Sequence, residues 1–329
     1  MKIPVTIRMI SKSQVEELVS VEDVIDAVEG TFRELGNGTI FHPIHEPIWM
    51  EEDRANMILA MPAYVTSSRL VGAKWVNMFS RQQPGLPASH GNLLVLSSAE
   101  NGLPYAIIEA SAITAMRTAG GHGVVSAKYL AKKDSSVLAV IGCGEEAKSG
   151  IKGYLHMFPG IQTLNVFDIR PQAMKEMQEL FGERLEIVCC DSAESAVRPA
   201  DIVLLVTTAT KPIVMFDWLK KGSFVSGMYS FNDLDPECSR KADKWYLGGR
   251  EIDTHNIINS PPMRKNHLSA ENVFGDMGEV VTGKCPGREN DQEIIVYTHM
   301  GMGALDVVVG DIIYKRAVDR NIGTIIDMG

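Results

Sequence analysis

A glycine-rich loop carries the strongest chemical signal in the sequence. It follows an apolar run at residues 137–141 and reads Gly142-Cys143-Gly144-Glu145-Glu146-Ala147. In such a loop the first glycine permits a tight turn and the second lets the backbone approach a pyrophosphate, while a small third residue lets the helix pack on the strand. The helix N-terminus that follows offers N–H donors to phosphate. The sequence therefore predicts a dinucleotide-binding loop; a flavin or nucleotide-sugar domain, or a loop without a ligand, is the alternative.

Asp168 indicates which dinucleotide the loop binds. It ends the next apolar run, at residues 164–167. A carboxylate at that place bonds both ribose hydroxyls and repels a 2′-phosphate, which favours NAD over NADP. Arg170, two residues later, keeps NADP open as the less favoured cofactor. Ile169 lies between them and is counted with the cofactor-binding residues.

Two cations in the first part of the chain could bind a substrate. Lys74 stands inside the apolar run 71–76, where it either points to solvent from an edge strand or lines a pocket with a lowered pKa. Arg117 lies on a mostly apolar helix that leads into the dinucleotide-binding part. Its guanidinium could bind a carboxylate through two hydrogen bonds, or form an interdomain salt bridge. Thr118 in the same turn is a candidate contact to the cofactor.

The sequence argues against several other chemistries. His42 and His45 are separated by Pro43, which spoils a helical metal motif, so we predict no metal site. No nucleophile elbow appears. The five cysteines are odd in number and lack metal-ligand spacing, and the adjacent pair Cys189-Cys190 is interpreted as buried structural thiols.

Composition and charge are those of a soluble globular protein, and the few cysteines together with the chain start favour the cytoplasm. The 329 residues are 45% hydrophobic and 22% charged, which suits a folded chain of two domains. A net charge of −9 disfavours a nucleic-acid surface. The chain start has no apolar signal core, and no apolar run reaches the roughly 18 residues of a membrane span. We expect a small-molecule substrate, with no nucleic-acid or membrane partner.

The pattern of elements changes near residue 118. Before it, helical spacing at 13–18 and 21–28, with Ser20 as N-cap, precedes strand-like runs at 56–60, 70–76, 92–97 and 105–109. One helix is expected from Ile113 to Lys132. Beyond it, apolar runs at 137–141, 164–167, 185–189, 201–206 and 223–227 alternate with helices, which is typical of a parallel sheet buried on both faces. A last helix, at 304–318, could return to the first domain. The predicted fold is α/β, a Rossmann NAD-binding domain (118–306) inserted into a split α+β substrate and dimerisation domain (1–117 plus 307–329).

Several strings in order resemble the ornithine cyclodeaminase/mu-crystallin family, and they cover nearly the whole chain. They are the loop 142–147 and the segments 72–74, 101–106, 113–119, 278–288, 301–306 and 321–324. The resemblance implies a homodimer, an NAD(P) domain, and hydride transfer at the Cα–N bond of an amino acid through an imine. It also implies that Arg117 holds the substrate carboxylate and Lys74 acts on that carboxylate or on an attacking water. Thr207, Thr208 and His299 would lie toward the nicotinamide, with His299 either an acid/base or a packing residue.

Departures from the family pattern separate its activities. His45 stands where cyclodeaminases carry an arginine, and Phe231 occupies the place of the aspartate that takes the side-chain amine; Asp233 could substitute only if its loop shifts. The segments 141–144, 216–222 and 286–291 instead resemble the siderophore branch that makes aminocarboxyethyl-glutamate. We therefore predict an NAD-dependent amino-acid dehydrogenase, ketimine reductase or opine-like synthase. An ammonia lyase that uses NAD catalytically is the alternative, and a non-enzymatic ligand-storing relative is disfavoured by the presence of Lys74 and Arg117.

Overall fold

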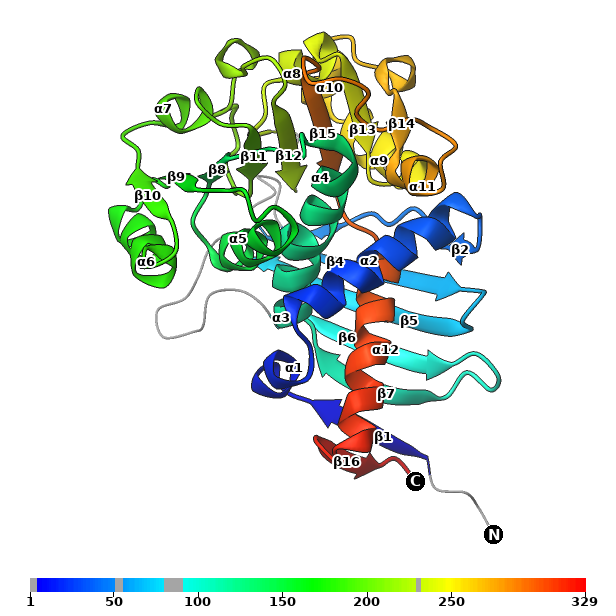
Figure 1. Ribbon diagram of the computed structural model, residues 1–329. Helices are drawn as coiled ribbons and strands as arrows, with labels where there is room; N and C mark the ends of the chain where they lie inside the picture. The colour runs from blue at the N-terminus through cyan, green and yellow to red at the C-terminus, as the bar shows by residue number, and fades with distance from the viewer. Residues whose placement is uncertain (1–4, 51–55, 80–90, 229–231) are drawn as a thin grey trace. The chain divides into compact units, whose positions relative to one another are not determined.

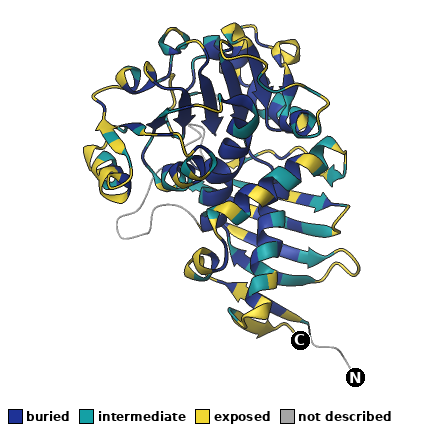
Figure 2. Ribbon diagram, in the orientation of Figure 1, coloured by how far each residue is buried: buried dark blue, intermediate teal, exposed yellow. Residues whose placement is uncertain are grey.

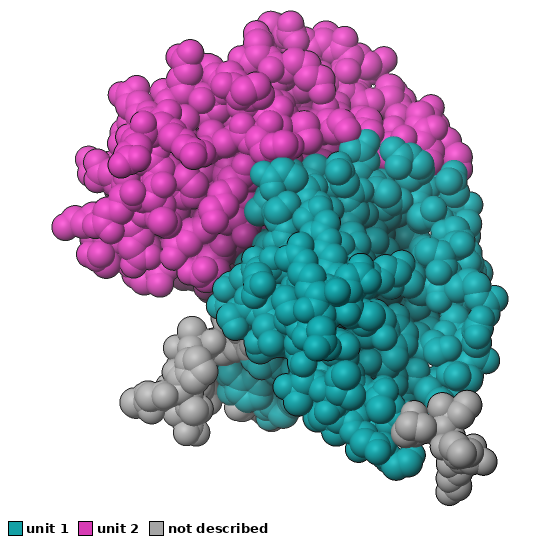
Figure 3. Space-filling view, turned by 60° about the horizontal axis from the view of Figure 1, so that its bottom comes forward, with its two compact units in different colours: residues 1–117, 302–329 teal, residues 118–301 magenta. Residues whose placement is uncertain are grey.

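The chain folds into two compact units, which Figure 3 colours separately. The computed structural model describes residues 5–50, 56–79, 91–228 and 232–329. Unit 1 combines Met1–Arg117 with Met302–Gly329, and unit 2 is Thr118–Gly301. The predicted fold class, a Rossmann domain inserted into a split α+β domain, is confirmed. The chain returns to unit 1 at Met302 rather than at the predicted Val307, because residues 303–306 are the first turn of the long helix of unit 1.

Unit 1 is built on an eight-stranded sheet in the order β16-β1-β7-β6-β5-β4-β2, with β3 also paired to β4. Among the strand pairs that the described residues form in this unit, only β1–β7 is parallel. The strands are β1 (Thr6–Ile10), β2 (Ile40–Phe41), β3 (Ile48–Trp49), β4 (Asn56–Val65), β5 (Leu70–Phe79), β6 (Leu93–Ser98), β7 (Pro104–Glu109) and β16 (Thr324–Asp327). The predicted strands at 56–60, 70–76, 92–97 and 105–109 are confirmed, and β1, β2, β3 and β16 are additional.

Helices α2 (Val21–Gly36) and α12 (Gly303–Asp319) lie across one face of this sheet, and α1 (Lys12–Leu18) and α3 (Ser111–Ala115) complete the unit (Figure 1). Ser20 caps α2 as predicted, in a capping box with Asp23. Arg316 of α12 donates two hydrogen bonds of 2.6 Å to the Asp23 carboxylate. These bonds are the main reason that the pKa of Asp23 lies well below its ordinary value. The ion pair therefore joins the two covering helices.

Unit 2 is an eight-stranded, wholly parallel sheet in the order β10-β9-β8-β11-β12-β15-β13-β14. Its central strands are buried on both faces, as their dark blue colour in Figure 2 shows. The strands are β8 (Val137–Ile141), β9 (Thr163–Phe167), β10 (Glu186–Cys189), β11 (Ile202–Leu205), β12 (Phe224–Met228), β13 (Lys244–Leu247), β14 (Gly275–Asp276) and β15 (Ile295–His299). The five predicted apolar runs are confirmed as β8–β12. Strands β13, β14 and β15 were not predicted.

Helices and helical turns connect these strands. They are α4 (Val124–Leu130), α5 (Glu145–Met157), α6 (Pro171–Phe181), α7 (Ala193–Val197), η2 (Phe216–Trp218), α8 (Pro236–Lys241), α9 (Arg250–Asp253), η3 (Thr254–Ile258), α10 (Pro261–Lys265), η4 (Ala270–Asn272) and α11 (Met277–Val281). The helix expected from Ile113 to Lys132 is present as α3, a π-helical stretch η1 (Met116–Gly123) and α4. Wide π-helical turns occur frequently at functional sites, and this one carries Arg117 and Thr118.

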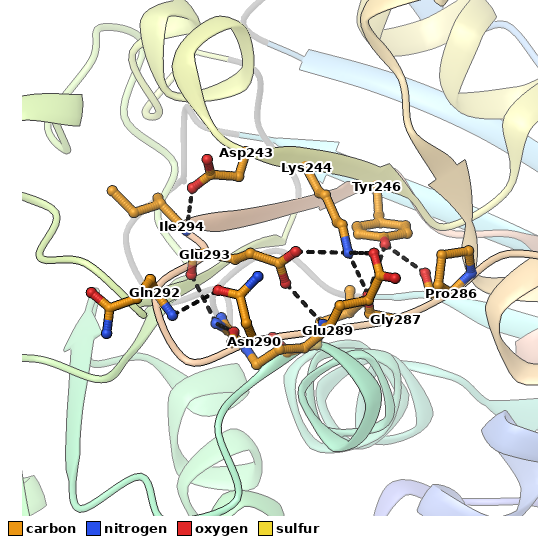
Figure 4. A network of polar contacts seen from close by, with 12 residues as sticks. Asp243, Lys244, Tyr246, Pro286, Gly287, Glu289, Asn290, Gln292, Glu293 and Ile294 are labelled. Carbon is orange, nitrogen blue, oxygen red and sulfur yellow. Dashed lines mark hydrogen bonds and ion pairs between the residues drawn. The ribbon is translucent and has the colours of Figure 1, made fainter.

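The segment 286–291, one of those that resemble the siderophore branch, forms a polar network at the amino ends of β13 and β15 (Figure 4). Buried Lys244 donates to the Gly287 carbonyl (2.9 Å) and pairs with Glu289 (2.6 Å) and Glu293 (2.9 Å). The Arg288 guanidinium donates to four backbone carbonyls. Ligands bind open parallel sheets at the carboxyl ends of the strands. This network is at the opposite ends, so we assign the segment to stability rather than to substrate recognition.

All five cysteines are free thiols. Cys143, Cys190 and Cys238 are buried, but Cys189 is exposed, so the interpretation of both adjacent cysteines as buried was wrong for Cys189. It ends β10, which is the edge strand of its sheet. In the described part of the chain, none of the helices has the length and apolar character that crossing a bilayer requires.

Candidate functional site

The turn between β8 and α5 has the geometry that its glycines predict. Gly142 has a φ of 93°, a left-handed conformation that favours glycine, and its N–H donates to the Phe167 carbonyl (2.9 Å). A Cβ at this position would lie 2.4 Å from the Val206 carbonyl oxygen, so no larger residue fits there. Ala147 is fully buried where α5 packs on the sheet. The turn therefore holds β8, α5 and the end of β11 close together.

Gly144 leaves open space in front of the N-terminus of α5. It is the N-cap of this 13-residue helix and supplies no side-chain cap to the first turn, which begins with Glu145 and Glu146. A Cβ on Gly144 would meet no atom within 4 Å. The N–H groups of a helix N-terminus attract anions, and here no side chain of the loop fills the space before them. The residues present therefore fit the pyrophosphate of a dinucleotide.

Asp168 lies beside the glycine loop. Its carboxylate accepts hydrogen bonds from the N–H of Cys143 (2.8 Å), the N–H of Arg170 (2.8 Å) and the Arg170 guanidinium (3.2 Å). Burial alone would raise the pKa of Asp168, but these bonds outweigh it and lower the pKa below its ordinary value. The side chain of Ile169 is 89% exposed. An anionic Asp168, fixed next to the loop, suits recognition of ribose hydroxyls.

Thr207 and Thr208 follow β11 at the carboxyl edge of the same sheet. Thr208 is exposed, whereas Thr207 donates a hydrogen bond of 2.7 Å from Oγ1 to the carboxylate of buried Asp233. This bond ties the loop after β12 to the end of β11. Phe231, which the sequence places at the cyclodeaminase aspartate, lies outside the described residues. The assignment of Asp233 to the substrate stays a prediction, and its carboxylate is already engaged by Thr207.

His299 ends β15 and is packed inside unit 2. Its Nδ1 lies 2.8 Å from the Asp253 carboxylate, which also accepts the N–H groups of Gly248 (2.8 Å) and Gly249 (3.0 Å). The ring of His122 stands edge-on to it, with centroids 4.7 Å apart. A Cβ at Gly248 would lie 2.1 Å from the His299 ring, so this glycine makes room for the imidazole. The sequence analysis missed Asp253 and His122, which surround His299 and hold its orientation.

Thr118 is the first residue of unit 2 and is only 2% exposed. Its hydroxyl has no hydrogen-bond partner among the described residues. Buried hydroxyls are normally bonded to protein, water or a ligand, so the Thr118 hydroxyl is available to a group that binds there. The observation suits its predicted place against the cofactor.

Unit 1 gathers Lys74, Arg117 and Asp306 at one buried point. Lys74 Nζ lies 2.9 Å and Arg117 Nε 3.3 Å from the same oxygen, Oδ1 of Asp306. The three residues come from β5, η1 and the first turn of α12, and they are 1%, 5% and 0% exposed. Lys74 therefore does not point to solvent from an edge strand, as one alternative held: it lies on the sheet face that α12 covers, together with Gly72 and Val76. A buried ammonium and a buried guanidinium thus lie side by side, and groups of this kind can bind the carboxylate of a substrate.

Asp306 was the main residue that the sequence analysis left without a role. Its signal was present, because it is an acid at the start of the apolar run 303–310. Acids are almost never fully buried unless they are paired. An aspartate on the buried face of such a helix therefore indicates a cation elsewhere in the fold. The cation that pairs with Asp306 is set by how β5 and η1 pack against α12. The spacing of apolar residues within α12 does not reveal that packing.

His45 lies in the loop between β2 and β3, both of which pair with β4, the neighbour of β5. Its side chain is buried. Its assignment to the substrate stays a prediction. Within the described ranges, no three histidine, cysteine, aspartate or glutamate side chains gather as metal ligands would.

Comparison with known proteins decides the family. The model of the ornithine cyclodeaminase/mu-crystallin family matches residues 6–321. The chain belongs to this family. It is 31% identical to the alanine dehydrogenase of Archaeoglobus fulgidus, over 96% of this chain and 97% of that one. It is also 31% identical to the N-((2S)-2-amino-2-carboxyethyl)-L-glutamate dehydrogenase of Staphylococcus aureus, over 83% of each.

A solved structure extends the likeness to three dimensions. The Delta(1)-pyrroline-2-carboxylate reductase of Thermococcus litoralis, in complex with NADH and L-proline, is 30% identical and superimposes with a TM-score of 0.86. The match covers 97% of this chain and 99% of that one. The predicted family resemblance is thus confirmed over the whole chain. These relatives are named as oxidoreductases of amino acids or cyclic imines.

Proposed function

We propose that the protein is an NAD-dependent oxidoreductase acting on the CH–NH or C=N bond of an amino acid. The observation that carries this proposal is the buried group in which Lys74 and Arg117 share Asp306 Oδ1. Its ammonium and guanidinium groups suit a substrate carboxylate, and the dinucleotide loop of unit 2 suits the hydride carrier. The relatives named above act on the same class of bond.

The cofactor is assigned to unit 2. Gly142 and Gly144 shape the loop, the first turn of α5 binds the pyrophosphate, and Asp168 bonds the adenosine ribose. When bound, NAD supplies the hydride acceptor for amino-acid oxidation and, as NADH, the hydride donor for imine reduction. Asp168 favours NAD over NADP, because a carboxylate fixed beside the loop bonds ribose hydroxyls and repels a 2′-phosphate. Further contacts are assigned to Thr118, Glu145, Glu146, Ala147, Ile169, Arg170, Thr207, Thr208 and His299.

Lys74 and Arg117 position the substrate. Arg117 binds the carboxylate, and Lys74 holds it from a second direction, which fixes the orientation of Cα. In oxidation the neutral amine uses its lone pair to form the C=N bond as the C–H bond at Cα breaks and the hydride leaves. Reduction is the reverse: hydride adds to the carbon of the protonated imine (the iminium), and the nitrogen regains its lone pair. For a dehydrogenase, the Lys74 ammonium orients the water that adds to the imine carbon.

The geometry gives less support to ornithine cyclisation. That reaction needs an acid to take the side-chain amine of the substrate. The aspartate available after β12, Asp233, is buried and bonded to Thr207 at 2.7 Å. Net redox, or reductive condensation with a 2-oxo acid, therefore stands as the first function, and NAD-assisted ammonia loss as the second.

One assay with two readouts separates these functions. The protein is incubated with NAD or NADP and a panel of L-alanine, L-proline, L-glutamate and L-ornithine, while NADH absorbance and free ammonia are followed together. We expect NADH to accumulate in proportion to the substrate consumed, and NAD to outperform NADP. Ammonia without net NADH would instead identify a cyclodeaminase. If neither appears, NADH is supplied with 2-oxo acids and amines; failure in that direction too would contradict an oxidoreductase.

We infer that the protein forms a homodimer through the sheet of unit 1. On the face opposite Lys74, Trp75 of β5 pairs with Leu93 of β6, and their side chains are 45% and 42% exposed. Met9 of β1, 40% exposed, lies on the same face. Exposed apolar patches of this kind mark interaction surfaces. A second copy of the same sheet is the occupant that the family resemblance implies.

Replacing Trp75 by glutamate should therefore convert a dimer into a monomer, because a charge buried between two sheets without a partner is costly. Light scattering should give twice the 36.1 kDa chain mass for the unmodified protein and the single mass for Trp75→Glu. Leu180→Glu is the control, since Leu180 is 58% exposed on α6 of unit 2. A monomeric wild-type protein, or a dimer that survives Trp75→Glu, would contradict this interface.

We also infer a cytoplasmic location. All five cysteines are free thiols, and Cys189 is exposed to solvent. Proteins with free, exposed thiols are typical of the reducing cytoplasm, whereas disulfides are typical of oxidising compartments.

A further inference from the structure

The carboxylate of Asp306 has one oxygen that nothing in the described chain bonds. Oδ1 is shared by Lys74 (2.9 Å) and Arg117 (3.3 Å), whereas Oδ2 is buried and has no hydrogen-bond partner among the described residues. The residue is 0% exposed, so solvent outside the protein does not reach it. Buried polar atoms are nearly always bonded, and an exception is explained by a bound water or by a group that arrives with a ligand. The missing group must be a donor, because an anionic carboxylate oxygen only accepts.

Positive charge surrounds the Asp306 carboxylate. It lies in the first turn of the 17-residue helix α12, where the helix dipole favours an acid, and it faces two cations. Asp311, the next acid of α12, differs in that it pairs with Lys315 at 2.8 Å. Asp306 is therefore an anionic acceptor placed directly beside the two cations that we assign to the substrate carboxylate.

We propose that Asp306 Oδ2 accepts an N–H of the substrate's α-amino group, while Arg117 and Lys74 bind the carboxylate attached to the same carbon. The inference rests on the proposed function and deepens it. Two cations beside an acceptor oxygen can recognise a carboxylate and an amine attached to the same carbon, which is the arrangement in an α-amino acid. When the amine becomes an iminium, positive charge develops on the nitrogen next to Asp306. A fixed anion there stabilises the oxidised form and the transition state that leads to it.

This assignment predicts discrimination between two kinds of ligand. L-Alanine and L-proline carry both a carboxylate and an N–H donor. Pyruvate and tetrahydrofuran-2-carboxylate match them in size and in the carboxylate, but each presents only an acceptor oxygen where the amine would be. The wild-type carboxylate attracts the first pair and repels the second. Asparagine at position 306 removes the charge and offers an N–H donor, so it should reverse the preference.

The test measures the binding of these four ligands to wild type and Asp306→Asn by titration calorimetry, each protein being saturated with NADH so that the amino acids are bound but not oxidised. We expect the variant to bind L-alanine and L-proline about 10–100-fold more weakly, as for loss of a hydrogen bond to a charged group. Pyruvate and tetrahydrofuran-2-carboxylate should bind equally well or more tightly. Asp311→Asn is the matched control on the same helix and should leave all four affinities unchanged.

Other outcomes overturn the proposal. Equal weakening of both ligand kinds would mean that Asp306 acts only by holding Lys74 and Arg117, and unchanged binding of all four would mean that it makes no substrate contact. Wild type that binds neither amino acid and oxidises none in the assay panel would remove the proposed function as well. A wild type that is active, with no discrimination at position 306, removes this inference alone.

A second variant covers the case in which Asp306→Asn does not fold. Asp306→Glu keeps the negative charge between the two cations, but its extra methylene displaces the free oxygen. We expect it to melt close to wild type and to weaken L-alanine and L-proline selectively. Wild-type affinity for the two amino acids in a folded Asp306→Glu would again overturn the proposal.

Discussion

Replacing Lys74 by methionine should lower the turnover number of amino-acid oxidation by about 10²–10³-fold, the range expected when one positioned hydrogen-bond donor is lost from a reaction site. Methionine fills a similar volume on β5 but carries no charge and no N–H donor. Arg117 remains to bind the carboxylate, so KM should rise less than turnover falls. NAD affinity should be unchanged, because the cofactor is assigned to unit 2. Steady-state kinetics and a separate NAD titration measure the two effects.

The stability of this variant needs its own control, because Lys74 is buried against Asp306 at 2.9 Å. Removing one partner of a buried pair commonly costs about 3–5 kcal/mol. Arg117 still faces the carboxylate, so we expect the loss to be smaller and the variant to fold. Lys12→Met, at an exposed lysine of α1, should change neither turnover nor melting temperature. Full activity in a folded Lys74→Met would rule out the role assigned to Lys74.

The cofactor loop could be predicted from sequence because its chemistry is local. Gly142, Gly144 and Ala147 act within one strand–turn–helix unit, and the positive φ of Gly142 is the requirement that its position in the motif implies. Asp168 follows for the same reason, since the end of the next parallel strand must lie beside the first. The pattern of buried strands fixed these positions without any knowledge of the rest of the fold.

The group around Asp306 could not be predicted in this way. Lys74 and Asp306 are separated by 232 residues along the chain and meet only because α12 packs on β5. Periodicity showed each element but not their contact. The same limit explains why β13 and β15 were missed: each is a short strand whose place is set by pairing within the sheet, and β15 ends in His299, which an apolar pattern does not include.

The strings that identified the family also divide into two kinds once their positions are known. The segment 301–306 supplies Asp306 to the group that we assign to the substrate, whereas the segment 286–291 forms the Lys244 network at the amino ends of the strands. Both are distinctive in sequence, and only their place in the fold separates a structural role from a chemical one. Likeness to the siderophore branch in the segment 286–291 therefore says little about the substrate.

Replacing Gly144 by alanine should weaken NAD binding by about 100-fold while leaving the protein folded. The added methyl group meets no protein atom within 4 Å, and Gly144 has an ordinary negative φ of −88°. The methyl group does enter the space before the N-terminus of α5, where we place the pyrophosphate. It should prevent one backbone N–H from approaching a phosphate oxygen closely. Loss of a hydrogen bond to a charged group costs about 2–3 kcal/mol of binding free energy. Fluorescence titration with NADH and a thermal melt without cofactor measure the two quantities.

Gly142→Ala is the informative partner of this variant, because it should fail for a different reason. Its Cβ would lie 2.4 Å from the Val206 carbonyl oxygen, and its φ of 93° is strained for any residue with a side chain. We expect a clear fall in melting temperature even without cofactor, together with loss of NADH binding. Gly30→Ala is the control, because Gly30 lies on α2 with open space around its Cβ position. It should leave NADH binding unchanged and raise the stability slightly, since alanine favours a helix more than glycine does. Normal NADH affinity in a folded Gly144→Ala would mean that the space before α5 does not hold the pyrophosphate.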